Sequence, residues 1–170
     1  MIYSFFVVNT QGKPRLAKFY ERVDESRQQR TIREVYSLVS KRSDRECNFI
    51  EHSGNDLFPA GTKLIYRTYA TLHFIVVADS TESELGILDL IQVLVETLDA
   101  QFESVCELHL IFNFHKVSAV VDEIIQGGLV LETSAAEVLQ ASTAVNKLEK
   151  DSMKVMVGGK INTGQSQTKF

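Results

Sequence analysis

The sequence has little cysteine or proline and no apolar run long enough to cross a membrane. Its two cysteines, Cys47 and Cys106, cannot build the disulfide framework of a small secreted domain and suit a reducing compartment. The apolar stretch at 2–8 has neither the basic segment nor the cleavage site of a signal peptide. Residue 2 is not glycine and the last four residues are not a prenylation box, so lipid anchors are not expected. We expect a cytosolic protein.

The motifs of common enzyme classes are missing as well. There is no Gly-rich dinucleotide motif and no nucleophile elbow, and the Gly-Gly-Lys at 158–160 lacks the upstream glycine of a phosphate loop. The four histidines show no metal-ligand spacing, and the overall acidity argues against nucleic-acid binding. Cys106 lies in an apolar stretch, which favours an inert buried thiol. We expect no catalysis, metal or cofactor; a cysteine-dependent enzyme, with a low-pKa thiol, remains a third hypothesis.

The length and composition are those of one soluble globular domain, with 170 residues, 44% of them hydrophobic and 24% charged. The charge is uneven: residues 1–45 carry ten Lys and Arg against five Asp and Glu, while residues 46–170 carry eight against seventeen. Such a pattern arises from two solvated faces, or from a basic patch that meets acidic partners or anionic lipid. The asymmetry alone favours the first interpretation.

Alternating apolar residues and turn signals predict five strands. They are expected at 2–8, 15–20 and about 47–51, with two more between 63 and 80 that fold around 68–71. A capping box at Ser26 and Gln29 predicts a helix between the second and third strands, with Lys41 and Arg42 in its last turn.

The helix expected after Thr81 and Glu84, another capping box, has an unusually wide apolar surface. Its polar residues step by three or four and form one narrow stripe, made of Asp89, Gln92, Glu96, Asp99 and Glu103. A sheet covers only one side of such a helix, so another part of the chain or a partner subunit must cover its flank.

The remainder of the chain predicts helices and a tail. The segment 105–114 is ambiguous between strand and helix, 116–126 predicts a helix capped by Gly127, and Ser134 opens a last helix. From Asp151 onward the composition predicts a flexible tail, which bounds a domain at 1–150 and leaves 151–170 outside it. The element order indicates an α+β fold with an antiparallel sheet and helices packed on its faces.

Several stretches, collinear over residues 1 to about 150, resemble the small (sigma) subunits of heterotetrameric clathrin-associated adaptor complexes. They are NTQGKPRLAKFY, YRTYATLHFIVVADS, ESELGILDLIQVLVETLD, VCEL, IFNF and GGLVLETS. Within the family, GKPRL, SELGILDLIQV and GGLVLET look like adaptor protein complex 3. The resemblance implies a longin-like fold, in which helices sandwich a five-stranded antiparallel sheet, and it favours a helix in the segment 105–114.

The resemblance also implies partners and a place in the cell. The large subunit with a delta-type trunk would hold this chain beside the beta and mu subunits, and would cover the flank of the second long helix. Such a complex carries cargo from Golgi or endosomes towards the lysosome or vacuole, so the chain would be cytoplasmic and peripheral on vesicle membranes, with only indirect membrane contact. A free longin-type regulatory domain that binds a small GTPase or a SNARE is the alternative.

Small subunits of this family help to recognise acidic dileucine signals, in which an acidic residue precedes a Leu-Leu or Leu-Ile pair by three residues. By resemblance, the leucine pocket would be lined by Ala70, Leu72, Val95, Ser104, Val105 and Leu110. Arg15 would face the acidic residue of the signal. Ser104 stands where Asn is common in the family, and His109 stands where Asp is usual. The residues alone favour ordinary core positions for Leu72, Val95 and Leu110, and Arg15 could be a solvated strand residue.

Overall fold

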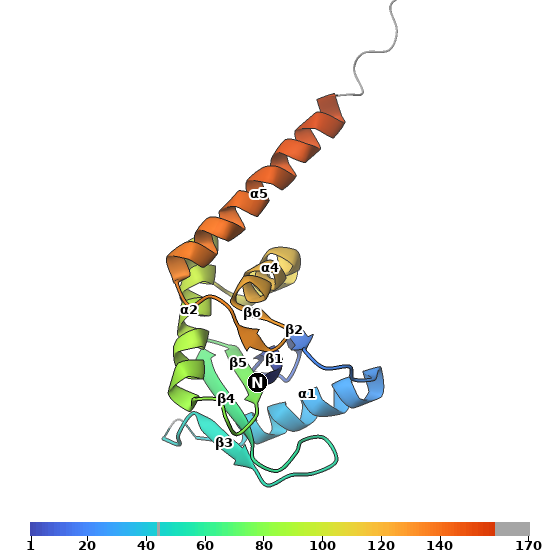
Figure 1. Cartoon of the computed structure of the whole chain (residues 1–170), viewed down its shortest axis with the longest axis vertical. Helices are drawn as coiled ribbons and strands as arrows, with labels where there is room; N and C mark the ends of the chain where they lie inside the picture. Colours follow the sequence, from blue (N-terminus) through green and yellow to red (C-terminus); the bar gives the residue numbers. More distant parts are fainter. Residues whose placement is uncertain (44, 159–170) are drawn as a thin grey trace, which may run out of the picture.

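A computed structural model describes residues 1–43 and 45–158 of the chain (Figure 1). Its five-stranded antiparallel sheet has the order β2-β1-β5-β4-β3. The strands are β1 (Ile2–Asn9), β2 (Pro14–Phe19), β3 (Phe49–His52), β4 (Thr62–Tyr69) and β5 (Leu72–Ala78). The helices are α1 (Glu25–Ser40), α2 (Glu84–Phe102), α3 (Glu107–Phe112), α4 (Phe114–Ile124) and α5 (Ala135–Gly158). This confirms the predicted longin-like α+β fold and the helix at α3.

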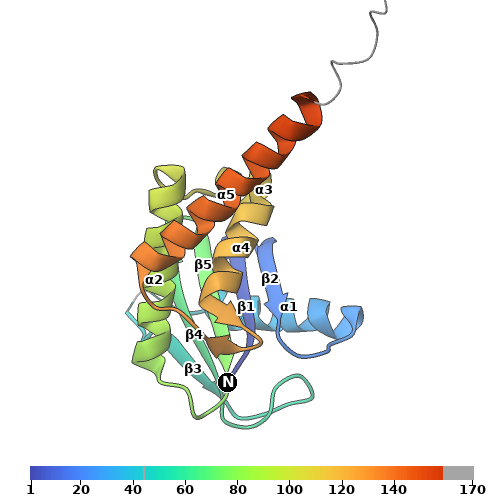
Figure 2. The same cartoon turned by 45° about the horizontal axis from the view of Figure 1, so that its top comes forward.

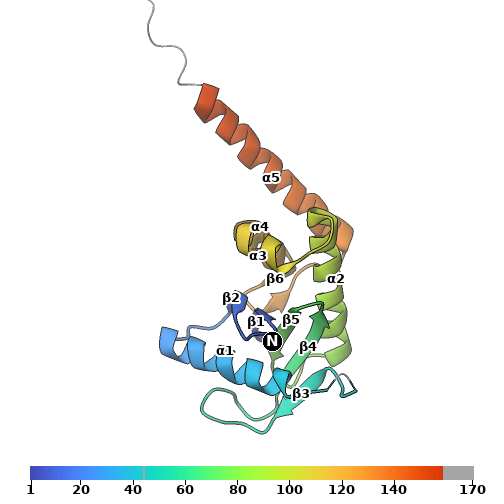
Figure 3. The same cartoon turned by 180° about the vertical axis from the view of Figure 1, so that it is seen from behind.

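Helices cover both faces of the sheet, with α1 on one side and α2, α3 and α4 on the other (Figure 3). Side chains alternate along each strand, so neighbours on β1 such as Phe5 and Phe6 belong to different cores. Phe5 lies in the core beneath α2 and α4, and Phe6 lies in the core beneath α1. The neighbouring strands β1 and β5 are therefore each buried on both faces, and the sequence of each is a nearly continuous apolar run.

The wide apolar surface of α2 is covered by this chain itself. One side of α2 packs on the sheet, and α4 and α5 pack against its flank. Val138 and Ser142 of α5 are buried there, while Leu85 at the start of α2 stays exposed. Of the two alternatives predicted for this flank, another part of the chain covers it, because the last helix folds back over it.

The capping boxes predicted at Ser26 and Thr81 each lie two residues from the real N-cap. Asp24 caps α1 by accepting a hydrogen bond from the amide of Arg27 at 2.7 Å. Ser83 caps α2 through the amide of Gly86. Lys41 follows the end of α1, so no basic residue lies in its last turn. The side-chain oxygens of Asp24 and Ser83 thus accept hydrogen bonds from free amides in the first turns of α1 and α2.

The prediction that Gly127 caps α4 is wrong, because Gly127 forms a turn with Gly128. The chain leaves α4 directly into a short hairpin, β6 (Ile125–Gln126) and β7 (Leu129–Val130), which the sequence did not predict. Both glycines have positive φ, 59° and 81°. The carbonyl of Gly128 accepts a hydrogen bond from the amide of Ile2 at 2.9 Å, so the hairpin closes one end of the sheet.

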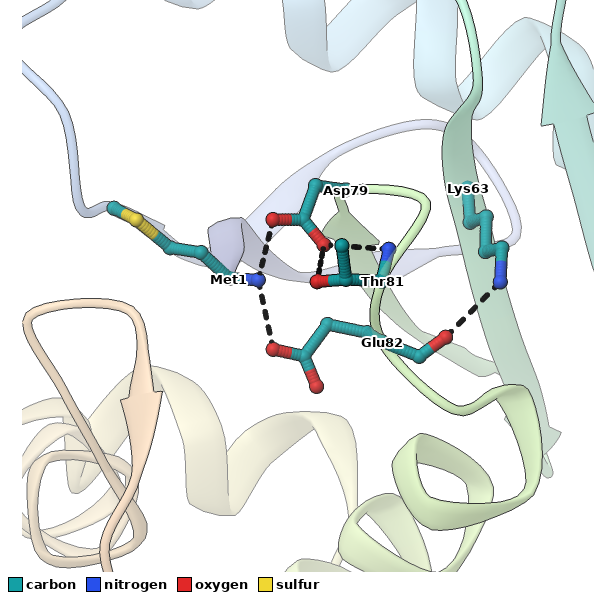
Figure 4. Close-up of polar contacts among 5 residues, drawn as sticks. All are labelled: Met1, Lys63, Asp79, Thr81 and Glu82. Atoms are coloured by element: carbon teal, nitrogen blue, oxygen red, sulfur yellow. Dashed lines mark hydrogen bonds and ion pairs between the residues drawn. The ribbon is translucent and has the colours of Figure 1, made fainter.

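The first residue is held at the same end of the sheet (Figure 4). The amino group of Met1 donates to Asp79 at 2.7 Å and pairs with Glu82 at 2.8 Å. The ammonium, followed by hydrogen bonds from Thr81, lowers the pKa of Asp79 to about 2. Lys63 donates to the backbone carbonyl of Glu82. These contacts join the starts of β1 and α2.

Helix α5 runs through the boundary predicted at residue 150 and continues to Gly158. Its C-terminal part extends away from the rest of the molecule (Figures 1 and 3). The remainder of the predicted tail, residues 159–170, lies outside the described residues.

Candidate functional site

The candidate site lies at the end of the sheet opposite the N-terminus, where α2 turns into α3 (Figure 2). The same end carries the short hairpin between β4 and β5, and the turn between β1 and β2. The amide of Thr10 donates to the carbonyl of Thr71 at 3.0 Å, which ties these two turns together. Segments more than 90 residues apart in the chain therefore meet here.

The predicted pocket residues are brought together, but their apolar members are packed into the core. Leu72, Val95 and Leu110 belong to one buried cluster, at 2%, 4% and 1% exposure, and Val105 packs partly buried against it. Ala70 and Ser104 are exposed beside them, at the hairpin tip and after α2. A leucine side chain could enter only if α3 or the preceding turn moved.

Backbone strain is concentrated at the same place. Among the described residues, the non-glycine residues with positive φ are Ala70 (52°), Glu103 (53°) and Ser104 (98°). A side chain disfavours this region of φ, so each conformation costs on the order of 1–3 kcal/mol and persists only where the surroundings enforce it. Two of these three residues are predicted site residues. Such strain is typical of binding sites.

Asp99 holds the strained turn after α2. Its carbonyl accepts hydrogen bonds from the amides of Glu103 and Ser104, and its carboxylate accepts one from the amide of Val105 at 2.6 Å. The polar stripe of α2 thus ends in a residue that shapes the site. The i+4 to i+6 spacing from Asp99 to this turn was the signal available in the sequence.

Arg15 is paired instead of solvated. Its Nε donates to Oε1 of Glu107 at 2.7 Å, and one of its terminal nitrogens forms an ion pair with the same oxygen. Asn9 also donates to that oxygen, at 2.9 Å. The hydrogen bonds from Arg15 and Asn9 lower the pKa of Glu107, because they stabilise its ionised form. Sequence reasoning missed Glu107 and Asn9, because nothing local links them to Arg15.

Two further residues lie beside the site: Cys106, the N-cap of α3, and His109 within α3. Cys106 is exposed at the N-cap position of α3, so the prediction of a buried thiol is wrong. The apolar stretch around Cys106 is broken by the turn, which leaves that thiol outside the core. His109 stacks on Phe102 with ring centroids 5.4 Å apart and joins α3 to the end of α2.

An apolar patch borders the site on its outer side. Leu108, Ile111 and Phe112 of α3 and Phe114 of α4 are exposed, Phe112 by 80%. A contiguous group of large exposed apolar side chains is typical of a protein-binding surface. A second group, residues 129–131, lies at the other end of the sheet on the β6–β7 hairpin.

The larger hollows lie elsewhere, on the face covered by α1. One of about 130 Å³ lies near the start of α1, and one of about 450 Å³ lies near its end, beside Tyr36, Arg42 and His73. Burial lowers the pKa of His73, whose Nδ1 lies 2.9 Å from the hydroxyl of Thr68. A void of about 10 Å³ lies between the sheet and the helices α2 and α4. No predicted site residue lines any of these three hollows.

No helix in the described ranges, 1–43 and 45–158, combines the length and apolar character needed to span a bilayer. The described side chains also form no group of three or more His, Cys, Asp or Glu residues that could hold a metal ion.

Comparison with known proteins identifies the family. The family model described as "Clathrin adaptor complex small chain" matches residues 1–149. "AP-3 complex subunit sigma" of Dictyostelium discoideum is 54% identical over 151 residues, 88% of each chain. "AP-3 complex subunit sigma-2" of Homo sapiens is 53% identical over 88% of this chain and 77% of its own length. The Arabidopsis thaliana "AP-3 complex subunit sigma" is 49% identical over 96% of this chain and 98% of its own.

The structure is also similar to a chain described as "Homology model of the full-length AP-3 complex in a stretched open conformation". The TM-score is 0.69 at 38% sequence identity, over 91% of this chain and 98% of that chain. Sequence, family model and structure agree over nearly the whole folded part. This chain therefore belongs to the family of clathrin adaptor complex small chains.

Proposed function

We propose that this chain is the small, sigma-type subunit of an AP-3-type adaptor complex and acts without catalysis in vesicle-mediated protein transport. The observation that carries the proposal is the roughly 50% identity to AP-3 sigma subunits over 88% or more of the chain. The family match over 1–149 supports residues 1–150 as the adaptor domain.

Its partners would be the other subunits of the heterotetramer: a large subunit with a delta-type trunk, and the beta and mu subunits. The exposed apolar patches on α3–α4 and on the β6–β7 hairpin are the surfaces that such partners would cover. Membrane contact would come through the assembled complex, which places the chain on the cytoplasmic side of Golgi or endosomal vesicles.

Within that complex, the strained end of the sheet would recognise acidic dileucine signals. Ala70, Leu72, Val95, Ser104, Val105 and Leu110 would receive the leucines, and Arg15 would face the acidic residue. Burial of two leucines contributes roughly 1.5–3 kcal/mol each before the costs of binding, and a partly exposed cation about 0–1 kcal/mol more. Micromolar or weaker affinity follows, strengthened at the membrane by several simultaneous contacts.

The experiment has two stages. Tagged chain recovered from cell extract should bring down large trunk-type subunits and a mu subunit, and recovery of none of them would contradict the adaptor assignment. The recovered complex is then titrated with a fluorescent acidic dileucine peptide. Arg15→Gln should weaken binding about fivefold, the effect of about 1 kcal/mol.

Lys18→Gln is the matched control, because Lys18 is a cation of the same strand that pairs with Asp122 at 2.7 Å. It should leave the affinity unchanged. An equal loss in both variants would show that the peptide responds only to overall charge.

A further inference from the structure

We propose that Glu107 is a built-in competitor for the acidic residue of the cargo signal, held on Arg15 by the fold. The inference rests on the proposed cargo site and adds the element that sets its selectivity. In the structure, the Glu107 carboxylate takes the place at Arg15 that a signal's carboxylate would take.

Glu107 is held in place independently of Arg15. Asn9 is 4% exposed, and its side-chain carbonyl accepts hydrogen bonds from the amides of Gln11 and Lys13 at 3.0 and 2.9 Å. The β1–β2 turn therefore fixes the Asn9 side chain, and its amide nitrogen points to Glu107 at 2.9 Å. A buried amide donor without an acceptor would be costly, so the fold itself favours the Glu107 carboxylate at this position.

The occupation of Arg15 is incomplete, which leaves room for competition. A single oxygen of Glu107 receives both Nε and one terminal nitrogen of Arg15. The other terminal nitrogen makes no hydrogen bond to a described residue. Because the side chains of Arg15 and Glu107 are 22% and 28% exposed, an incoming carboxylate can reach the pair.

An incoming carboxylate meets repulsion from Glu107 at the same cation, or must displace it. Either event lowers the affinity for the acidic residue without affecting the leucines. Because of Glu107, the affinity of the complex for a signal would depend mainly on burial of the leucines. Acidic segments that lack the leucine pair would be kept from occupying Arg15.

The test measures peptide binding to the assembled complex for wild type and Glu107→Gln. Gln keeps the acceptor oxygen for Asn9 and Arg15 and removes the charge. Glu107→Gln should bind an acidic dileucine peptide about three- to tenfold more tightly, the range expected when a like charge is removed near a partly exposed pair. A peptide with Gln in place of its acidic residue should bind both proteins equally.

The matched control is Asp122→Asn, which removes the charge of the carboxylate that pairs with Lys18. Lys18 lies on β2, as Arg15 does, and this variant should leave both affinities unchanged. Equal or weaker binding of the acidic peptide by Glu107→Gln would overturn the proposal and make Glu107 a residue that only positions Arg15. A gain for both peptides, or in Asp122→Asn as well, would also overturn it. If wild type binds neither peptide, the cargo site of the proposed function fails first, and this inference falls with it.

Discussion

The two ends of the sheet are built in different ways. At the N-terminal end, tight turns use glycine where φ is positive; ion pairs link Met1 to Asp79 and Glu82, and Lys63 to Glu84 at the start of α2. At the other end, glycine supplies positive φ in the β1–β2 turn at Gly12, but Ala70, Glu103 and Ser104 adopt it although each carries a side chain. The first end is relaxed and tied together, whereas the second is strained.

If the proposed cargo site is correct, the difference separates closure of the fold from binding. A relaxed end with glycine at its turns gains stability, and nothing there requires a strained backbone. The backbone of the α2–α3 turn does not maximise stability, because replacement of Glu103 or Ser104 by glycine would relieve its strain. The same end holds the Arg15–Glu107 pair and the packed apolar residues of the candidate pocket.

The largest expected effect is at the N-terminal end, in the turn between β6 and β7. A Cβ added at Gly128 would lie 2.4 Å from the carbonyl oxygen of Ile2, in addition to the unfavourable φ of 81°. Gly128→Ala should lower the free energy of unfolding by about 3 kcal/mol, measured by urea denaturation of the full chain.

Gly127→Ala is the matched control, because its φ is also positive but a Cβ there meets nothing within 4 Å. It should cost only about 1 kcal/mol. Equal losses would show that the close approach of the hairpin to β1 adds nothing to stability.

A smaller effect, dependent on pH, is expected for Asp79. Its pKa in the folded chain is lowered to about 2 from an ordinary 3.8, so its stabilising contribution is present above about pH 4 and is lost as the pH falls towards 2. Asp79→Asn should lower the free energy of unfolding by about 1 kcal/mol at pH 7. The difference from wild type should shrink as the pH approaches 2 and vanish below it; a constant difference across this range would contradict the ion-pair explanation.

The smallest effect, of opposite sign, is expected at the strained end. Ala70→Gly relieves about 1–2 kcal/mol of backbone strain but increases the entropy of the unfolded chain. The net result should be stabilisation by about 0.5 kcal/mol, measured by thermal and urea unfolding. Destabilisation of that size would mean that the Ala70 methyl group is needed for packing and that the hairpin is not strained.

Hydrophobic periodicity predicted the sheet and its helices because those patterns are local. The starts of α1 and α2 were displaced by two residues, since Asp24 and Ser83 reach free amides that Ser26 and Thr81 do not, whereas α5 begins directly after Ser134 as predicted. The sequence predicted that the flank of α2 needs cover but left open what covers it, because the fold-back of α5 is a tertiary contact.

The candidate site shows the same limit. Resemblance supplied its apolar residues and Arg15, and the structure places them at one end of the sheet. The residues alone favoured core positions for Leu72, Val95 and Leu110, but the pairing of Arg15 with Glu107, 92 residues away, could not be predicted from local sequence. The exposure of Cys106 follows from the turn in which it lies, which no periodicity marked.

The proposal that the strained end binds cargo is tested most directly by hydrogen exchange of the assembled complex with and without an acidic dileucine peptide. The peptide should slow exchange over residues 68–73 and 103–112 and leave residues 25–43, along α1, unchanged. Slower exchange over 36–43, beside the cavity of about 450 Å³, with no change over 103–112, would place the binding site on the other face and contradict the proposal.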